Sequence, residues 1–276
     1  MADPHGIAAA REGLELYGRI IAARIRAQLQ YRTSFVLESV GMFFVTFLDF
    51  VVILIIFASV PALAGWSRAE VALLYGIAAL SFALTDLVVG QLDWLSEWVR
   101  DGTFDGMLVR PRSTLFQVIA SDFQIRRVGK LLQGLVVLVF ALVALDIQWT
   151  PLRALVLVAA VPIGAAIFIS IWVLMISIVF WTVDGREAAN AFTYGGSFLA
   201  QFPMNIYDRW VRRLLGYIVP IAFVAYFPSL YILDKPDPLG LPAVLQFVGP
   251  LVAVASAFIA AFVWRFAVRH YQSAGG

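Results

Sequence analysis

The chain of 276 residues contains no cysteine and only two histidines, which lie near its ends at positions 5 and 270. The missing thiols exclude disulfides, thiolate metal sites and cysteine nucleophiles. Without an interior histidine there is no such base to activate a serine, and there is no HExxH zinc motif. We therefore expect neither catalytic residues nor a metal site in this chain.

A Walker A phosphate-binding loop is also missing. The nearest match, Gly129-Lys130, is followed by Leu131 where the motif requires Ser or Thr, and Gln124 stands where its first glycine belongs. The chain is therefore not expected to hydrolyse ATP or to bind a cofactor of its own. Enzyme is the least favoured class.

Charge is scarce as well, with 14% charged residues against 62% hydrophobic ones. Such a chain is far too apolar for a soluble domain. Uncharged segments long enough to cross a bilayer follow one another from residue 33 onward. The composition predicts an all-α integral membrane protein that is surrounded by lipid and has no nucleic acid among its partners.

Six transmembrane helices are expected, over residues 33–60, 70–92, 128–148, 154–183, 188–207 and 238–264. A further apolar segment, 210–233, carries Pro220 and Pro228, which remove helical hydrogen bonds. We interpret it as a re-entrant helical segment between helices five and six. Seven crossings are the alternative that the sequence leaves open. Residues 33–268 are expected to form the transmembrane domain.

The two ends of the chain are polar. Residues 1–32 contain an apolar stripe opposite a charged one, which predicts a helix lying in the membrane interface; a plain cytosolic extension is the alternative. Residues 269–276 would be a short tail. Because Arg and Lys concentrate at the N-terminus and between residues 93 and 130, the positive-inside rule places these regions, and with six crossings both termini, in the cytoplasm.

The segment from 93 to 111, DWLSEWVRDGTFDGMLVRP, is a charged insert between two apolar segments. Its first eight residues predict a short amphipathic helix, with Trp94, Leu95, Trp98 and Val99 on one side and Asp93, Ser96, Glu97 and Arg100 on the other. Gly102 can end this helix in a left-handed conformation. The insert would lie on the cytoplasmic surface.

Two carboxylates, Asp49 and Asp86, fall inside expected spans. Acidic groups in a membrane are costly and by default suggest a proton relay or a contact for a cationic substrate. The alternative is a structural role, in which each carboxylate faces the bundle and is paired there; we favour it for Asp86. Aromatic residues near the fifth span, among them Phe198 and Phe202, are interpreted as an interfacial belt or as the lining of a path for an apolar solute.

The run Gly102-Thr103-Phe104-Asp105-Gly106-Met107-Leu108-Val109-Arg110-Pro111 is similar to the G-x-[FL]-D-x-x-L-x-R-P stretch of ABC-2 type transporter permeases. The chain resembles in particular the bacterial subgroup often encoded as two permeases with one ATPase. Supporting matches lie between Gly65 and Gly76 and between Pro203 and Phe223. The resemblance covers nearly the whole chain in order.

This resemblance implies a membrane-spanning permease subunit in the bacterial inner (cytoplasmic) membrane. It would form a dimer with a second permease, the same or a different chain, and would be driven by an ATP-binding subunit that holds ATP and Mg. Residues 93–111 would be the coupling helix that docks on the ATPase. In it Glu97 and Arg100 would be charged contacts, Phe104 a plug, and Asp105 with Arg110 the residues that hold the turn between Gly102 and Pro111.

The expected substrate is a small amphipathic or hydrophobic compound, drug-like or lipid-like, and the expected direction is export. Asp49, Asp86, Phe198 and Phe202 are the candidate residues of the translocation path. The alternative function is a proton-coupled secondary transporter that uses Asp49 and Asp86, although the chain has no inverted repeat in hydropathy.

Overall fold

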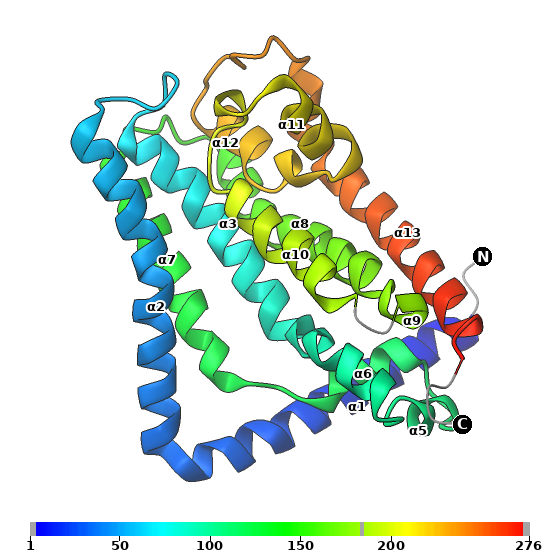
Figure 1. Cartoon of the computed structure of the whole chain (residues 1–276). Coiled ribbons are helices and arrows are strands. Elements are labelled where there is room, and N and C mark those ends of the chain that lie inside the picture. The colour runs from blue at the N-terminus through cyan, green and yellow to red at the C-terminus, as the bar shows by residue number, and fades with distance from the viewer. Residues whose placement is uncertain (1–3, 183–184, 273–276) are drawn as a thin grey trace.

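The structure is a computed structural model that describes residues 4–182 and 185–272. Every regular secondary-structure element in these ranges is a helix (Figure 1). The expected all-α membrane fold is confirmed. Residues 273–276 of the expected tail and residue 183 of the expected fourth span lie outside the described residues. The α-helices are α1 Pro4–Gln28, α2 Arg32–Ser59, α3 Arg68–Val89, α4 Leu95–Arg100, α5 Asp105–Leu108, α6 Thr114–Ser121, α7 Val128–Ala144, α8 Pro151–Ile176, α9 Val179–Thr182, α10 Arg186–Leu199, α11 Arg209–Arg213, α12 Tyr226–Ile232 and α13 Gly249–Arg269.

Five helices in the described part of the chain are long and apolar enough to cross a membrane. A sixth would be a bent pair, Arg209–Gly216 with Ile221–Ile232, whose halves differ in direction by 70°. This pair occupies the range expected for the re-entrant segment, and Pro220 stands at its break. The five are Glu15–Ser59, Arg68–Arg100, Ile125–Ala144, Pro151–Thr182 and Gly249–Arg269.

The expected fifth span, 188–207, is shorter in the structure. Its helix α10 has 14 residues, which cover about 21 Å at about 1.5 Å per residue. The hydrocarbon core of a bilayer is roughly 30 Å thick. Pro203 disfavours helical geometry at the residue before it, and the chain turns after Leu199 instead of continuing as a helix. The expected last span also begins later, at Gly249, because a loop and a 3₁₀ turn occupy 234–248.

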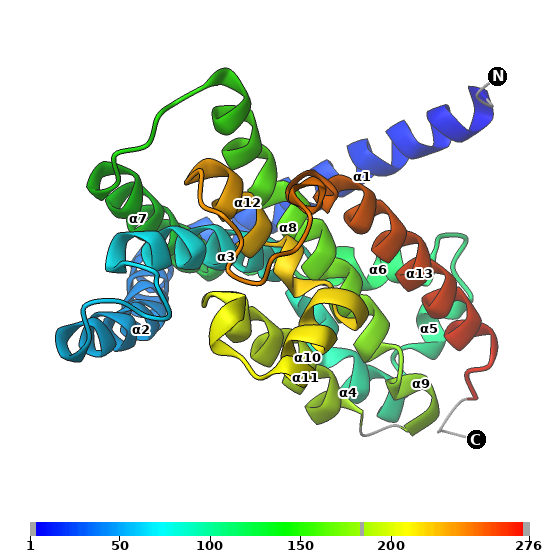
Figure 2. The same cartoon turned by 90° about the horizontal axis from the view of Figure 1, so that it is seen from above.

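Helix α3 is the centre of the bundle. Seen from above, α2 and α7 stand on one side of it, and α8 and α13 follow on the other (Figure 2). Every residue from Val71 to Ala78 is at most 1% exposed, apart from Gly76, which is also buried. A helix that is apolar on all sides is expected to be covered on all sides. Helix α2, in contrast, leaves Phe44, Leu48 and Ile55 more than 60% exposed on its outer side.

Glycine permits the close contacts of α7 with its two neighbours. A Cβ at Gly76 of α3 would lie 2.8 Å from the Cα of Leu138 in α7. A Cβ at Gly129 of α7 would overlap the backbone oxygen of Ser39 in α2. Small residues are what let membrane helices approach this closely.

At the upper end of the bundle in Figure 1, ion pairs join the first turns of α3 and α8 to the loop before α13. The Nζ of Lys235 lies 2.9 Å from both carboxylate oxygens of Glu70 and 4.7 Å from the ring centre of Trp66, which is fully buried. Arg153, at the start of α8, pairs with Asp234 at 3.0 Å. These contacts, which we call the upper latch, connect the α2–α3 loop to the segment before α13.

Helix α1 runs beneath the lower end of the bundle and meets α2 at a sharp corner after a 3₁₀ turn over Leu29–Tyr31 (Figure 1). The amide of Gln28 donates to the backbone oxygen of Phe123 and accepts from the backbone N–H of Ile125. Arg24 lies 3.5 Å from Asp122. This position suits the interfacial helix expected from the sequence, which stays a prediction.

Gly129→Ala should destabilise the protein, because the new methyl group must push α2 away from α7. Overpacking of a buried contact typically costs about 1–3 kcal/mol, and we expect a fall of several degrees in the melting temperature of the detergent-solubilised protein. Gly41→Ala in α2 is the control, because a Cβ there meets nothing within 4 Å. Equal melting temperatures for the two variants would contradict this account of the α2–α7 contact.

Candidate functional site

The coupling segment, residues 93–111, folds against the lower end of the bundle (Figure 1). It consists of the end of a 3₁₀ turn over Gly90–Trp94, the short helices α4 and α5, and the turn between them. Gly102 has φ +75°, as its sequence position predicts, and the backbone N–H of Phe104 donates to the oxygen of Trp98 at 2.9 Å. The chain thus reverses directly after α4.

The buried face of this segment differs from the one expected. Leu95 and Val99 are buried as predicted, but Trp94 is 47% exposed and Ser96 is buried. Trp94 departs from the expected helical wheel because it belongs to a 3₁₀ turn, which has three residues per turn. Ser96 lies in α4 itself, on the face that packs against the bundle. Arg100 is exposed, whereas Glu97 is half-buried.

Phe104 is fully buried inside this chain. Its ring centre lies 5.0 Å from that of Phe180 in α9 and 5.3 Å from that of Tyr271 after α13. Within this chain the ring fills the space between the ends of α9 and α13, and its role as a plug of the coupling segment stays a prediction. The ring attaches the coupling segment to the ends of two helices of the bundle. Burial of a large aromatic ring stabilises such a contact.

The second half of the segment carries its exposed tip. Val109 is 85% exposed and Leu108 is 42% exposed, next to the exposed Arg110 and Pro111. The backbone N–H of Asp105 donates to the oxygen of Gly102 at 3.1 Å. A joint role of Asp105 and Arg110 in holding the turn stays a prediction.

Preceding this tip, Asp101 accepts a hydrogen bond from the backbone N–H of Thr103 at 3.0 Å. Hydrogen bonds from Thr103 hold the pKa of this exposed carboxyl below its usual range. Asp101 is therefore anionic at neutral pH. Together with Arg100 and Arg110 it gives the exposed surface of the segment charges of both signs.

Polar side chains join helix α10 to the coupling segment. Glu97 and Arg186, the first residue of α10, form an ion pair at 2.5 Å, and the guanidinium of Arg186 lies 5.9 Å from the ring centre of Trp94. Further along the same helix, the hydroxyl of Tyr194 donates a hydrogen bond to Asp93 at 2.9 Å. Sequence reasoning missed Arg186 and Tyr194 because nothing in a linear pattern brings together residues that are 89 and 101 positions apart.

Asp86 is at the centre of a buried ion cluster. Its carboxylate lies 2.6 Å from the Nζ of Lys130 and 3.3 Å from the Nε of Arg127, and its side chain is 3% exposed. Arg127 also donates to the backbone oxygen of Asp86 at 2.7 Å and to Gln91 at 3.3 Å. A Cβ at Gly90 would overlap this cluster. The structural role favoured for Asp86 from the sequence matches this geometry.

Asp49 has a different environment. In the described part of the chain its carboxylate forms no hydrogen bond or ion pair, and it lines a cavity of about 230 Å³ together with Phe198, Gln133 and Lys130. Phe202 does not line this cavity; it is 8% exposed, and its ring packs 5.5 Å from that of Phe198.

A second cavity, of about 180 Å³, lies next to the first and reaches the coupling segment. Asp86, Asp93 and Arg186 line it, and the two cavities share Lys130 and Tyr194. Of the four residues expected to form a path, the structure therefore brings Asp49 and Phe198 to one cavity and Asp86 to its neighbour.

These features define a multi-pass, all-α membrane protein with a charged segment folded against one end of its bundle and polar cavities between its helices. Comparison with protein families matches residues 43–275 to the family described as ABC-2 family transporter protein. The chain belongs to this family: it is a membrane permease subunit of an ABC transporter, and a transport subunit instead of a catalytic one. No curated protein sequence and no solved structure matches the chain.

Asp86→Ala should strongly destabilise the protein, because it leaves Arg127 and Lys130 as buried cations without their anion. Removing one partner of a buried pair costs about 3–5 kcal/mol. We expect a large fall in melting temperature and in the yield of monodisperse protein in mild detergent. Asp49→Ala removes an unpaired carboxylate and is the control, for which we expect little change in melting temperature. Equal falls in melting temperature for the two variants would contradict a stabilising role of the ion cluster.

Proposed function

We propose that this chain is the permease of an ATP-driven exporter of amphipathic or hydrophobic compounds, and that a separate ATP-binding subunit docks on the coupling segment. ATP and Mg would be held by that partner. The observation that carries the proposal is the attachment of the coupling segment to α10 through Glu97–Arg186 and Tyr194–Asp93. A displacement of residues 93–111 would thereby reach the cavity that Phe198 lines.

The docking surface would be the exposed part of the segment. Val109 and Leu108 offer apolar area, while Arg100 and Arg110 offer charge at its edge. An apolar centre with a polar rim is the usual anatomy of a protein interface. Glu97 and Phe104, expected from the family resemblance to contact the ATPase, would instead transmit its movement, because both are occupied by contacts within the chain.

The path of the substrate would begin at the two adjoining cavities. Their lining combines aromatic rings, amides and the carboxylate of Asp49, which is the composition expected for amphipathic ligands with a weak preference for cations. A second permease, identical or different, would complete the path. The exposed apolar side of α2 is available to it or to lipid. In this arrangement the protein lies in the bacterial inner membrane with both termini in the cytoplasm.

The secondary-transporter alternative receives no support. Its two carboxylates have different roles in the structure, because Asp86 is paired with two cations while Asp49 lines a cavity. Because the chain belongs to the ABC-2 family, ATP hydrolysis by a partner subunit is the expected source of energy, in place of a proton gradient. Asp49 therefore enters the proposal as a substrate contact.

Docking can be tested by cross-linking, because the chain has no native cysteine. Val109→Cys should cross-link through a short bifunctional reagent to the ATP-binding subunit when the two are co-expressed and purified together. Val244→Cys is the matched control, since Val244 is 63% exposed in the 3₁₀ turn before α13. Cross-linking at position 244 and not at position 109 would contradict the proposed docking surface.

The attachment to α10 can be tested by charge reversal. Glu97→Arg should place two cations side by side and lower substrate-stimulated ATP hydrolysis of the reconstituted complex several-fold. The double variant Glu97→Arg with Arg186→Glu should restore most of it, because the ion pair is re-formed in the opposite sense. Arg100→Glu is the comparison: it changes an exposed charge, so Arg186→Glu should not rescue it. Failure of the double variant to regain activity would contradict the proposed transmission.

A further inference from the structure

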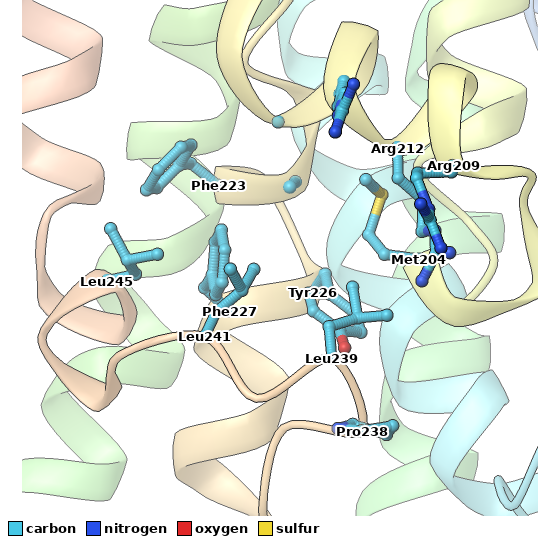
Figure 3. Close-up of a pocket in the computed structure, with 13 residues that line it drawn as sticks. Met204, Arg209, Arg212, Phe223, Tyr226, Phe227, Pro238, Leu239, Leu241 and Leu245 are labelled. Atoms are coloured by element: carbon cyan, nitrogen blue, oxygen red, sulfur yellow. The ribbon is translucent and has the colours of Figure 1, made fainter.

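A cavity of about 510 Å³ lies at the end of the bundle opposite the coupling segment, between α11, α12 and the loop before α13 (Figure 3). Its volume is within the range of about 300–1,000 Å³ that is typical of small-molecule sites. No residue of this cavity belongs to the proposed path or to the coupling segment. It is therefore a separate candidate site.

The cavity has an apolar half and a cationic half. Phe223, Phe227, Leu241 and Leu245 lie together on one side in Figure 3, whereas Arg209 and Arg212 lie on the other. Phe223 and Phe227 are 7% and 4% exposed, so their rings form a fixed wall. Arg213 is the third guanidinium of the lining. A ligand that fills the whole cavity must itself have an apolar part and an anionic part.

The three guanidinium groups have no partner within the described part of the chain. No hydrogen bond or ion pair is formed by the side chain of Arg209, Arg212 or Arg213, and the Nε of Arg212 is buried without an acceptor. Buried donors are almost always hydrogen-bonded in native proteins. This set of donors is therefore complementary to an anion that is absent from the chain itself.

No carboxylate is among the described residues that line the cavity. Asp237, next to the lining residue Pro238, accepts from the hydroxyl of Tyr226 at 2.6 Å and from the backbone N–H groups of Leu239 and Leu241 at 3.0 and 3.2 Å. Asp234 pairs with Arg153 in the upper latch. The described lining of the cavity thus has three guanidinium groups and no carboxylate, and it carries an excess of positive charge.

We propose that this cavity binds an anionic phospholipid, with its phosphate on Arg209, Arg212 and Arg213 and an acyl chain against Phe223 and Phe227. Basic pockets between membrane helices on the cytoplasmic side recognise lipid head groups, and we apply the same chemistry to this end of the bundle. Arginine suits the phosphate because its fork of donors matches the phosphate oxygens. A free inorganic phosphate would use the cationic half only. The assignment is independent of the proposed transport function, because binding needs no ATPase.

The test measures lipid binding to the purified permease in detergent micelles by native mass spectrometry. Dioleoyl phosphatidylglycerol is titrated against dioleoyl phosphatidylcholine, which has the same chains and no net charge. We expect the anionic lipid to bind about tenfold more tightly. Arg212→Gln should remove most of this preference, because a hydrogen bond to a charged group contributes enough for about a tenfold change in affinity.

Arg68→Gln is the matched control, because Arg68 is exposed at the same end of the bundle, outside the cavity. It should leave the preference unchanged. Should Arg212→Gln reduce folding, the double variant Arg209→Gln with Arg213→Gln carries the same expectation, since both side chains are exposed. Equal affinity for the two lipids, an equal effect of Arg68→Gln, or displacement of the lipid by millimolar inorganic phosphate alone would each overturn the proposal.

Discussion

The hydrocarbon core of a bilayer contains no water to bind backbone amides, and this constraint governs the whole structure. Each spanning segment must satisfy its own hydrogen bonds, so it is a helix. The irregular backbone of the bent pair at Pro220 lies at the upper end of the bundle instead of in its middle. The central helix α3 then has to be enclosed by α7 and α8, and glycines at the crossings permit this.

Charged groups inside such a bundle are costly, and their pairing organises the lower half of the protein. The Asp86 cluster fixes α3 to the start of α7, while Glu97 and Asp93 attach the coupling segment to α10. These two sets of contacts border the same cavity. The lower surface is thus joined to α3 through the ion cluster and to α10 through the coupling segment.

Much of this architecture could be predicted from the sequence, because long apolar runs without charge leave few alternatives in a membrane protein. The ranges of α2, α3, α7 and of α8 together with α9 follow from them within a few residues. The short α10 did not follow, since apolar composition alone does not reveal that Pro203 ends a helix early. Contacts across the chain were also inaccessible: Arg127 and Lys130 lie more than forty positions from Asp86, and the burial of Phe104 depends on Phe180 and Tyr271.

The upper latch also gives the protein an internal optical marker. Trp66 is fully buried, with the ammonium of Lys235 4.7 Å above its ring, and it is held there by the pairing of Lys235 with Glu70. An indole in this position emits in an apolar environment beside a cation. Any conformation in which the α2–α3 loop leaves the segment before α13 transfers that ring to water and removes the charge. The colour of its emission is therefore tied to the state of the end of the bundle that lies farthest from the coupling segment.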